Sequence, residues 1–405
     1  MWCVVRLPGL CLRHIGLCAC FALLSASLIG CGGDGGGPSG ETTTTVTTTT
    51  STIPTPDEPL YSCKSTLELS GAKSMARKGM CLDDTTFQQC AENITALWPH
   101  TDHPVTSIRM FKPWQPDWGD DIARRKAWGV LAAFVHKNNA TVLIGAEVTC
   151  NATHDDAVWN WTLELMQVLG PEHIMGVAFG NELELLFQKT GVKQDCVEEL
   201  WGGGRYFDTL VSRAEDMDRN EAFKSVKLTS VFGAYCLAGF PFVDSPVSQV
   251  LTYLRKAWQK YGDRWAWSFN VYPFWDNKCG GAFPVVPAVM KKFRERVAKV
   301  TGGQNATLWM TETGWSSSPP QYYNQPCPGY CSAERLQAYY ESFLQWDVGT
   351  AVDGDTDHAF YFTMRDARNF DITESFGLVG TCQNTSCKLQ KNETPVVRLP
   401  KNVVI

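Results

Sequence analysis

The feature of this sequence that most restricts its fold is an alternation that begins near Thr66 and runs almost to the C-terminus. Short apolar runs rich in Val, Ile, Phe and Trp alternate with longer stretches whose apolar residues recur at helical spacing. This pattern is typical of a parallel β/α fold, because parallel strands are joined by helical crossovers. The predicted strands are Thr106–Phe111, Thr141–Val148, Ile174–Phe179, Lys227–Gly233, Trp265–Val271, Thr307–Thr311 and His358–Thr363, with a vaguer first strand at Leu67–Ala72.

Helices are expected between these strands, and several of them begin with Asp, Ser or Pro, as helix caps do. Eight strands, each followed by a helix, predict an α/β fold of the closed (β/α)8 TIM barrel type. An open nucleotide-binding sheet fits less well, because no Gly-x-Gly-x-x-Gly follows the first strand and Gly202-Gly203-Gly204 reads as a turn. The expected helices are Asp84–Trp98, Asp120–Asn138, Asp155–Val168, Phe207–Asn220, Val247–Tyr261, Pro287–Val300 and Ala333–Trp346.

Two segments without barrel character precede this region. Residues 1–31 predict a secretory signal peptide, because Arg6 and Arg13 precede an apolar run. An uncleaved membrane anchor is the alternative, since the run nearly reaches bilayer-spanning length, and the residues up to Cys31 also resemble a lipoprotein box. Residues 32–60 are rich in Gly, Thr and Pro and predict a disordered stalk, either a functional spacer or a simple tether, which leaves 61–405 for the barrel domain.

The cysteines and glycosylation motifs indicate an oxidising secretory route. Eleven cysteines lie from Cys63 onward, and they lack the paired spacing of a zinc site, so disulfides are expected. Cys327 with Cys331 and Cys382 with Cys387 are candidate pairs, and the odd total leaves a free thiol or a partner in Cys31 or another chain. We therefore predict a secreted or cell-surface glycoprotein, with sequons at Asn93, Asn139, Asn151, Asn160, Asn305, Asn384 and Asn392.

The overall charge favours neutral or weakly charged partners. The formal net charge is -6, and Lys and Arg form no long blocks, so no nucleic-acid partner is expected. We expect a monomer whose mature domain does not insert into a membrane. No cofactor or metal is predicted.

Two of the predicted strands end in a glutamate. Glu182 follows the fourth strand and Glu312 follows the seventh, at the end of the barrel where active sites lie. Strands four and seven face each other, so these carboxyl groups can meet across the barrel mouth at the roughly 5 to 5.5 Å that a retaining glycosidase requires. The alternative is that both cap the following helices or form ion pairs on the rim.

The short sequence motifs around these glutamates resemble those of glycoside hydrolase family 17, the β-1,3-glucanases and their relatives. Gly180-Asn181-Glu182 is similar to the family's fourth-strand motif, and Glu312-Thr313-Gly314-Trp315-Ser316 to its seventh. Phe269-Asn270-Val271-Tyr272-Pro273-Phe274, Glu374-Ser375-Phe376-Gly377-Leu378 and Ile108-Arg109 resemble three further motifs in the same order. The resemblance covers about residues 70 to 380.

The resemblance implies a role for each matching residue. Glu182 would be the acid/base and Glu312 the nucleophile, while Asn181 would hold the sugar 2-hydroxyl and Tyr272 would orient Glu312. The substrate would be a β-glucan polysaccharide or oligosaccharide. Tyr272 is otherwise a core tyrosine, and Glu184 is interpreted as a first-turn helix residue. The residues implied to shape the substrate groove are Asn270, Arg109 and Glu374.

Aromatic side chains after the strands are candidates for stacking on sugar rings, and each could equally pack in the core. They are Trp114, Trp118, Phe274, Trp275 and Trp315.

The chain also departs from the family. Phe111 and Lys112 stand where the family tends to have Tyr and Asp, and Arg365 or Arg368 would replace a cation after the last strand. These departures affect linkage and chain-length preference more than reaction type. A β-1,3-glucanosyltransferase and a non-catalytic glucan-binding surface protein stay open as alternatives.

Overall fold

The computed structural model describes Cys63 and residues 71–187, 193–238, 249–276, 278–320, 327–349, 356–368, 374–384 and 386–389. The predicted signal peptide (1–31) and stalk (32–60) lie outside the described residues, as does the sequon at Asn392. No helix among the described residues has both the length and the apolar character needed to cross a membrane.

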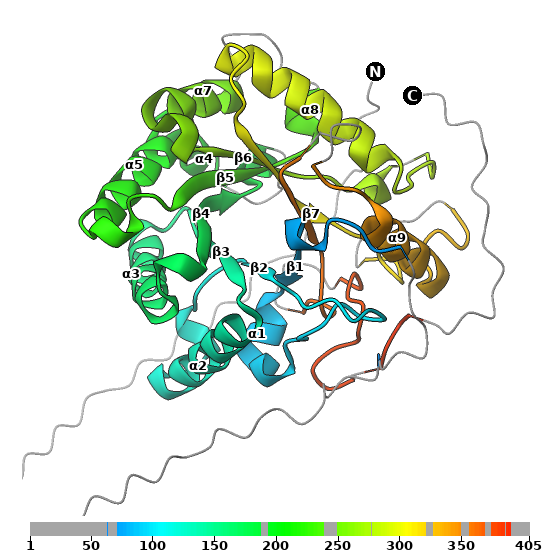
Figure 1. The fold of residues 1–405 in the computed structure, drawn as a ribbon. Coiled ribbons are helices and arrows are strands. Elements are labelled where there is room, and N and C mark those ends of the chain that lie inside the picture. The colour runs from blue at the N-terminus through cyan, green and yellow to red at the C-terminus, as the bar shows by residue number, and fades with distance from the viewer. Residues whose placement is uncertain are drawn as a thin grey trace, which may run out of the picture. The chain divides into compact units, whose positions relative to one another are not determined.

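Eight parallel strands close into a barrel in chain order, with helices between them around the outside (Figure 1). The predicted (β/α)8 TIM barrel is thereby confirmed. Most strands are buried along nearly their whole length, as expected for a sheet that is covered on both faces. The strands are β1 Lys78–Leu82, β2 Ser107–Met110, β3 Thr141–Ala146, β4 Ile174–Asn181, β5 Lys227–Gly233, β6 Ala266–Asn270, β7 Thr307–Thr313 and β8 His358–Tyr361.

Most helices follow the sequence pattern, but the first helix, α1, ends at Cys90, so the expected extension of this helix to Trp98 was wrong. Side chains cap several helix N-termini. Asp83 accepts a hydrogen bond from Thr86 N, Asp120 from Ile122 N and Ala123 N, and Ser332 from Arg335 N. The helices are α1 Asp84–Cys90, α2 Asp121–Asn138, α3 Ala152–Leu169, α4 Gln194–Leu200, α5 Arg205–Asp218, α6 Tyr235–Ala238, α7 Gln249–Tyr261, α8 Val285–Thr301 and α9 Ala333–Gln345.

The first strand lies later in the chain than the sequence pattern predicts. The first strand of the barrel spans Lys78–Leu82 and pairs with β2 and β8, so its expected position at Leu67–Ala72 was wrong, and residues 67–70 lie outside the described residues. The lysine at its start hides the strand from a search for apolar runs. Lys78 is fully buried, and its ammonium donates hydrogen bonds to three main-chain carbonyls, those of Lys73, Leu344 and Trp346, at 2.6–2.7 Å.

The chain after β8 also differs from the prediction. The described residues that follow Tyr361 contain no helix, and disulfides tie this segment to the start of the domain. Cys63 bonds to Cys387 and Cys90 to Cys382, so the pairing of Cys382 with Cys387 was wrong.

The other two disulfides also join residues distant in the sequence. Cys279 bonds to Cys327, which excludes the predicted Cys327–Cys331 pair, and Cys150 bonds to Cys196. Proximity in the sequence did not determine which cysteines pair, because a disulfide requires a short Cα–Cα distance in the folded chain. Cys81 and Cys236 are buried and form no disulfide, in agreement with the expectation of a free thiol.

Candidate active site

The end of β4 has an irregular backbone that positions Glu182. The register between β4 and β5 shifts between Ala178 and Asn181, and Gly180 and Glu182 have φ angles of 72° and 51°. A left-handed conformation is rare for a residue with a side chain, and such residues cluster at functional sites. The Glu182 N–H donates to Val231 O at 2.8 Å, which fixes this turn against β5.

Glu312 reaches the same end of the barrel from β7. A register shift between Phe269 and Asn270 pairs Asn270 of β6 directly with Glu312. Bulges of this kind redirect side chains next to active sites. Val271 N donates to Glu312 O at 2.8 Å, and the Glu312 side chain is almost entirely buried.

Two buried donors hold the Glu312 carboxylate. Arg109 Nη1 donates to Oε1 at 2.5 Å, and the hydroxyl of Tyr272 donates to Oε2 at 2.7 Å. The other guanidinium nitrogen of Arg109, Nη2, donates to Asn181 Oδ1 at 2.7 Å. The carboxylate therefore has a fixed orientation and a paired charge.

Asn270 connects this group to the second glutamate. Its Nδ2 donates to Glu182 Oε1 at 3.0 Å, and its Oδ1 accepts from Arg109 Nη1 at 3.3 Å and from the Thr311 hydroxyl at 2.9 Å. Glu182 and Glu312 thus belong to one network of hydrogen bonds, although they are far apart in the sequence.

The electrostatics of the two glutamates differ. Burial raises the pKa of Glu182, and the negative charge of Glu312 raises it further. Burial and the same neighbouring charge raise the pKa of Glu374 to about 8. The structure therefore favours a neutral, proton-carrying Glu182 beside a Glu312 that is paired with Arg109.

A cavity of about 570 Å³ contains both carboxyl groups. Such a volume is typical of small-molecule sites. Seven of the predicted site residues line it, and four aromatic side chains that were not predicted as site residues line it as well, namely Phe111, Tyr235, Phe362 and Phe376. Phe111 and Phe362 directly follow β2 and β8, Tyr235 begins α6 two residues after β5, and these positions beyond strand ends were the available signal. The seven predicted residues are Asn181, Glu182, Asn270, Tyr272, Trp275, Glu312 and Glu374.

The structure does not bring every predicted aromatic residue to this cavity. Trp275 is 39% exposed and lines it, whereas Trp315 is 2% exposed and its indole N–H donates to Tyr330 O at 2.9 Å. Trp114, Trp118 and Phe274 are also buried. Of the five, only Trp275 has the exposure that stacking on a sugar ring requires.

Glu184 has a structural environment of its own. It lies in the first turn of a 3-10 helix, Leu183–Phe187, as predicted, and its carboxylate accepts from Gly233 N at 2.5 Å. Burial raises its pKa. This bond ties the turn that carries Glu182 to the end of β5.

One group of described residues brings potential metal ligands together, and it is already used for another purpose. The sulfurs of Cys63 and Cys387 lie near His100, but these two cysteines form a disulfide.

Comparisons with known proteins give structural neighbours of low similarity. No protein-family model and no curated protein matches the sequence. An active-site mutant of a Rhizomucor miehei β-1,3-glucanosyltransferase, in complex with laminaritriose, is 13% identical, with a TM-score of 0.47 over 77% of this chain and 96% of that chain. An endo-laminarinase from Formosa is 14% identical, with a TM-score of 0.43 over 73% and 76%. The GH53 catalytic domain from Ignisphaera aggregans is 11% identical, with a TM-score of 0.44 over 80% and 96%. The function must therefore be inferred from the site itself.

Proposed function

We propose that this protein is a secreted, retaining β-glucan hydrolase that acts on β-1,3-glucan, with Glu182 as acid/base and Glu312 as nucleophile. The observation that carries the proposal is the convergence of two carboxyl groups on one cavity, one favouring its protonated form and the other paired with Arg109. Retaining glycosidases need this combination of an acid and an ionised nucleophile.

In the first chemical step, Glu312 attacks the anomeric carbon while Glu182 protonates the departing glycosidic oxygen. The bond to the leaving sugar breaks, and a covalent glycosyl–Glu312 ester forms. Tyr272 and Arg109 hold the carboxylate in one orientation, which favours a near-attack geometry. In the second step, Glu182 removes a proton from water as the water oxygen attacks the same carbon and frees Glu312.

A neutral polysaccharide suits the surroundings of the site. The chain carries a net charge of -6, and the cavity combines polar side chains with the partly exposed ring of Trp275. Apolar faces of pyranose rings pack well on such rings. The choice of β-1,3-glucan rests on the resemblance of the strand-end motifs to glycoside hydrolase family 17.

The test is an assay of the purified protein on laminarin, mixed-linkage glucan and β-1,4-glucan. Wild type is compared with Glu312→Gln and Glu182→Gln, and with Glu164→Gln as a control on the outer helix α3. We expect cleavage of laminarin by wild type and the control only, and NMR of the first product should show the β-anomer.

Three outcomes would change the proposal. Equal turnover by wild type and Glu312→Gln would remove the mechanism, and cleavage of β-1,4-glucan alone would remove the substrate. Products longer than the substrate would assign a glucanosyltransferase, in which a sugar hydroxyl replaces water in the second step.

A further inference from the structure

A second cavity opens beside the one that holds the two glutamates. It has a volume of about 430 Å³ and is lined by residues at and beyond the ends of β2, β3 and β4. Phe111 and Asn181 line both cavities. The two are therefore adjoining parts of one groove at the same end of the barrel.

A cluster of mixed charge forms the wall of this second cavity. Lys112 Nζ lies 2.8 Å from Glu147 Oε1 and 3.5 Å from Asp84 Oδ2, and it donates to Gln115 Oε1 at 2.7 Å. The other oxygen of Glu147, Oε2, lies 2.8 Å from His154 Nε2. The three N–H groups of the ammonium thus have three acceptors, whereas a carboxylate has about four lone-pair positions, of which Glu147 uses two.

This distribution of charge restricts the ligand. An ammonium group already occupies the space between the carboxylates of Glu147 and Asp84, so a metal cation would be repelled there. The same carboxylates disfavour an anion. What Glu147 still offers is acceptor capacity, and the groups that match it are neutral O–H donors such as sugar hydroxyls.

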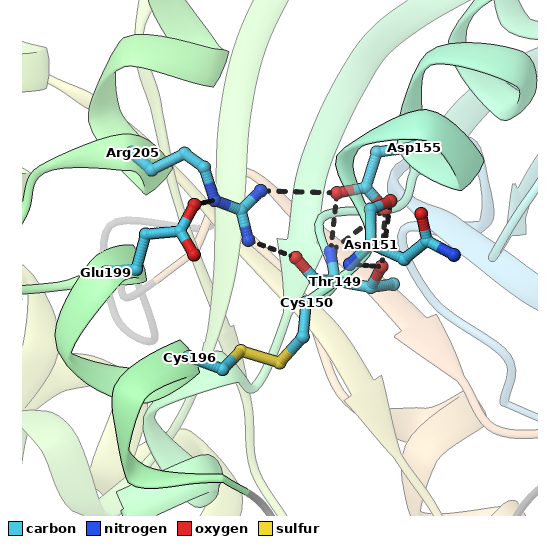
Figure 2. The surroundings of a disulfide bond; sticks show 7 residues. All are labelled: Thr149, Cys150, Asn151, Asp155, Cys196, Glu199 and Arg205. Atoms are coloured by element: carbon cyan, nitrogen blue, oxygen red, sulfur yellow. Dashed lines mark hydrogen bonds and ion pairs between the residues drawn. A yellow bond between two sulfur atoms is a disulfide. The ribbon is translucent and has the colours of Figure 1, made fainter.

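The loop that carries Glu147 is held rigidly. Asp155 accepts hydrogen bonds from Thr149 N at 2.9 Å and from the Thr149 hydroxyl at 2.6 Å, and Arg205 donates to Thr149 O. The next residue, Cys150, is bonded to Cys196 of α4 (Figure 2). A wall fixed before binding costs less ordering entropy when the ligand arrives.

We propose that this second cavity is a binding site for a neutral pyranose unit, with Glu147 as its principal hydroxyl acceptor and Lys112 holding Glu147 in place. The inference rests on the proposed glucan hydrolase function and extends it. The site would bind a sugar unit of the same chain that reaches the two glutamates, and it would make activity depend on chain length.

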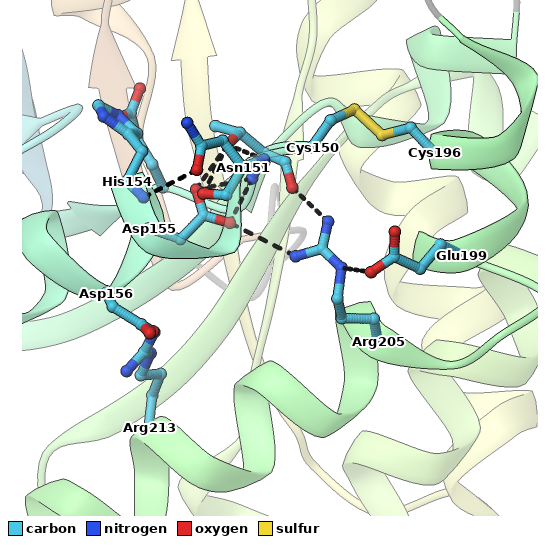
Figure 3. Close-up of polar contacts among 11 residues, drawn as sticks. Cys150, Asn151, His154, Asp155, Asp156, Cys196, Glu199, Arg205 and Arg213 are labelled. Atoms are coloured by element: carbon cyan, nitrogen blue, oxygen red, sulfur yellow. Dashed lines mark hydrogen bonds and ion pairs between the residues drawn. A yellow bond between two sulfur atoms is a disulfide. The ribbon is translucent and has the colours of Figure 1, made fainter.

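The test compares Glu147→Gln with wild type on laminari-oligosaccharides of two to six glucose units. The control is Asp156→Asn, an exposed acid on the same helix as His154 that pairs with Arg213 (Figure 3). We expect Glu147→Gln to lower kcat/KM roughly tenfold for the longest substrates, as the loss of a charge-assisted hydrogen bond predicts, with progressively smaller losses for shorter ones. The control should follow wild type at every length.

Calorimetric titration of the same oligosaccharides into Glu312→Gln protein, with and without Glu147→Gln, separates the two proposals. Weaker binding of long chains by the Glu147→Gln protein supports the second site even if wild type shows no hydrolysis, in which case only the proposed activity fails. An equal loss at every length, or no loss, in a variant that keeps the wild-type melting temperature overturns the second site. Absence of both binding and turnover by wild type overturns both.

Discussion

Both ends of the barrel bury ionisable side chains, but the partners of these side chains differ between the two ends. At the amino ends of the strands, three carbonyls surround the ammonium of Lys78, and His358 pairs with the Ser107 hydroxyl at 2.7 Å. At the carboxyl ends, Glu182, Glu312 and Glu374 line one cavity. Arg109 forms an ion pair with only one of these three acids, Glu312.

This difference indicates that the amino ends of the strands serve stability and the carboxyl ends serve chemistry. Each buried group at the amino ends has its own neutral partners, which is how a packed interior tolerates polar atoms. The carboxyl ends keep crowded like charges and a strained backbone at Glu182, features that cost stability and persist where function requires them.

The largest effect should come from the nucleophile at the functional end. Glu312→Gln retains the shape of the side chain, and Arg109 keeps Thr311 O and Asn181 Oδ1 as acceptors, so the fold should persist with reduced stability. Loss of the attacking carboxylate should lower kcat/KM on laminarin by on the order of 10⁴-fold. Steady-state kinetics measures the loss, and a circular-dichroism melt checks the fold. A residual activity within tenfold of wild type would contradict the assignment.

The next largest effect should come from removing the buried cation at each end of the barrel, Arg109 or Lys78, and comparing the losses of stability. Arg109→Met leaves the buried carboxylate of Glu312 without its ion pair, and we expect a loss of about 3–5 kcal/mol in the free energy of unfolding. Lys78→Met leaves carbonyls rather than a charge, and should cost about 1–3 kcal/mol. Urea denaturation measures both.

The double variant Arg109→Met/Glu312→Gln provides the control for this comparison. It removes the uncompensated charge, so it should recover part of the stability that Arg109→Met loses. If the double variant is less stable than Arg109→Met alone, charge pairing is not what Arg109 contributes.

A smaller effect should follow from the disulfide that braces the functional end. Cys150→Ser/Cys196→Ser opens a covalent loop with a sequence separation of 46 residues, for which the loss is about 2–4 kcal/mol. Loss of the disulfide should weaken binding at the proposed pyranose site more than it disturbs Glu182 and Glu312, because Cys150 adjoins the wall of that site. The test is the ratio of kcat/KM for six-unit and three-unit laminari-oligosaccharides, which should fall; an unchanged ratio would mean that the disulfide serves stability alone.

The two ends should also differ in the pH dependence of their stability. The raised pKa of Glu374 means that the folded state holds its proton more tightly, so stability decreases as pH rises from 4.5 to about 8. The pKa of His358 is lowered from 6.5 to about 3 by burial, so stability decreases as pH falls through that interval.

Melting temperatures across pH 3 to 8 measure both contributions. The difference in melting temperature between Glu374→Gln and wild type at pH 4 serves as the reference. As the pH rises toward 8, the melting temperature of Glu374→Gln should increase relative to that of wild type. His358→Gln should lose less stability than wild type between pH 6.5 and pH 3. Parallel curves for a variant and wild type would mean that its group has the same pKa folded and unfolded.

Much of the barrel could be predicted from the sequence, because short-range patterns define its elements. Lys227–Gly233 matches β5 at both ends, and apart from the first helix, which ends at Cys90 rather than Trp98, the expected helices agree to within about three residues. Apolar runs bounded by polar caps carry this information locally. Where a strand began with a buried lysine, as β1 does, the local pattern failed, since only the tertiary fold supplies the three carbonyls that accept from Lys78.

The sequence by itself determined the order of the elements and placed Glu182 and Glu312 at strand ends, because both follow from local periodicity. Only the tertiary structure decided how Asn270 and Arg109 join the two carboxyl groups, that Trp315 packs inside rather than lining the cavity, and which cysteines pair. The physical reason is distance along the chain. Such contacts join residues up to 324 positions apart, and local preferences carry no information about which of them the closed barrel brings together.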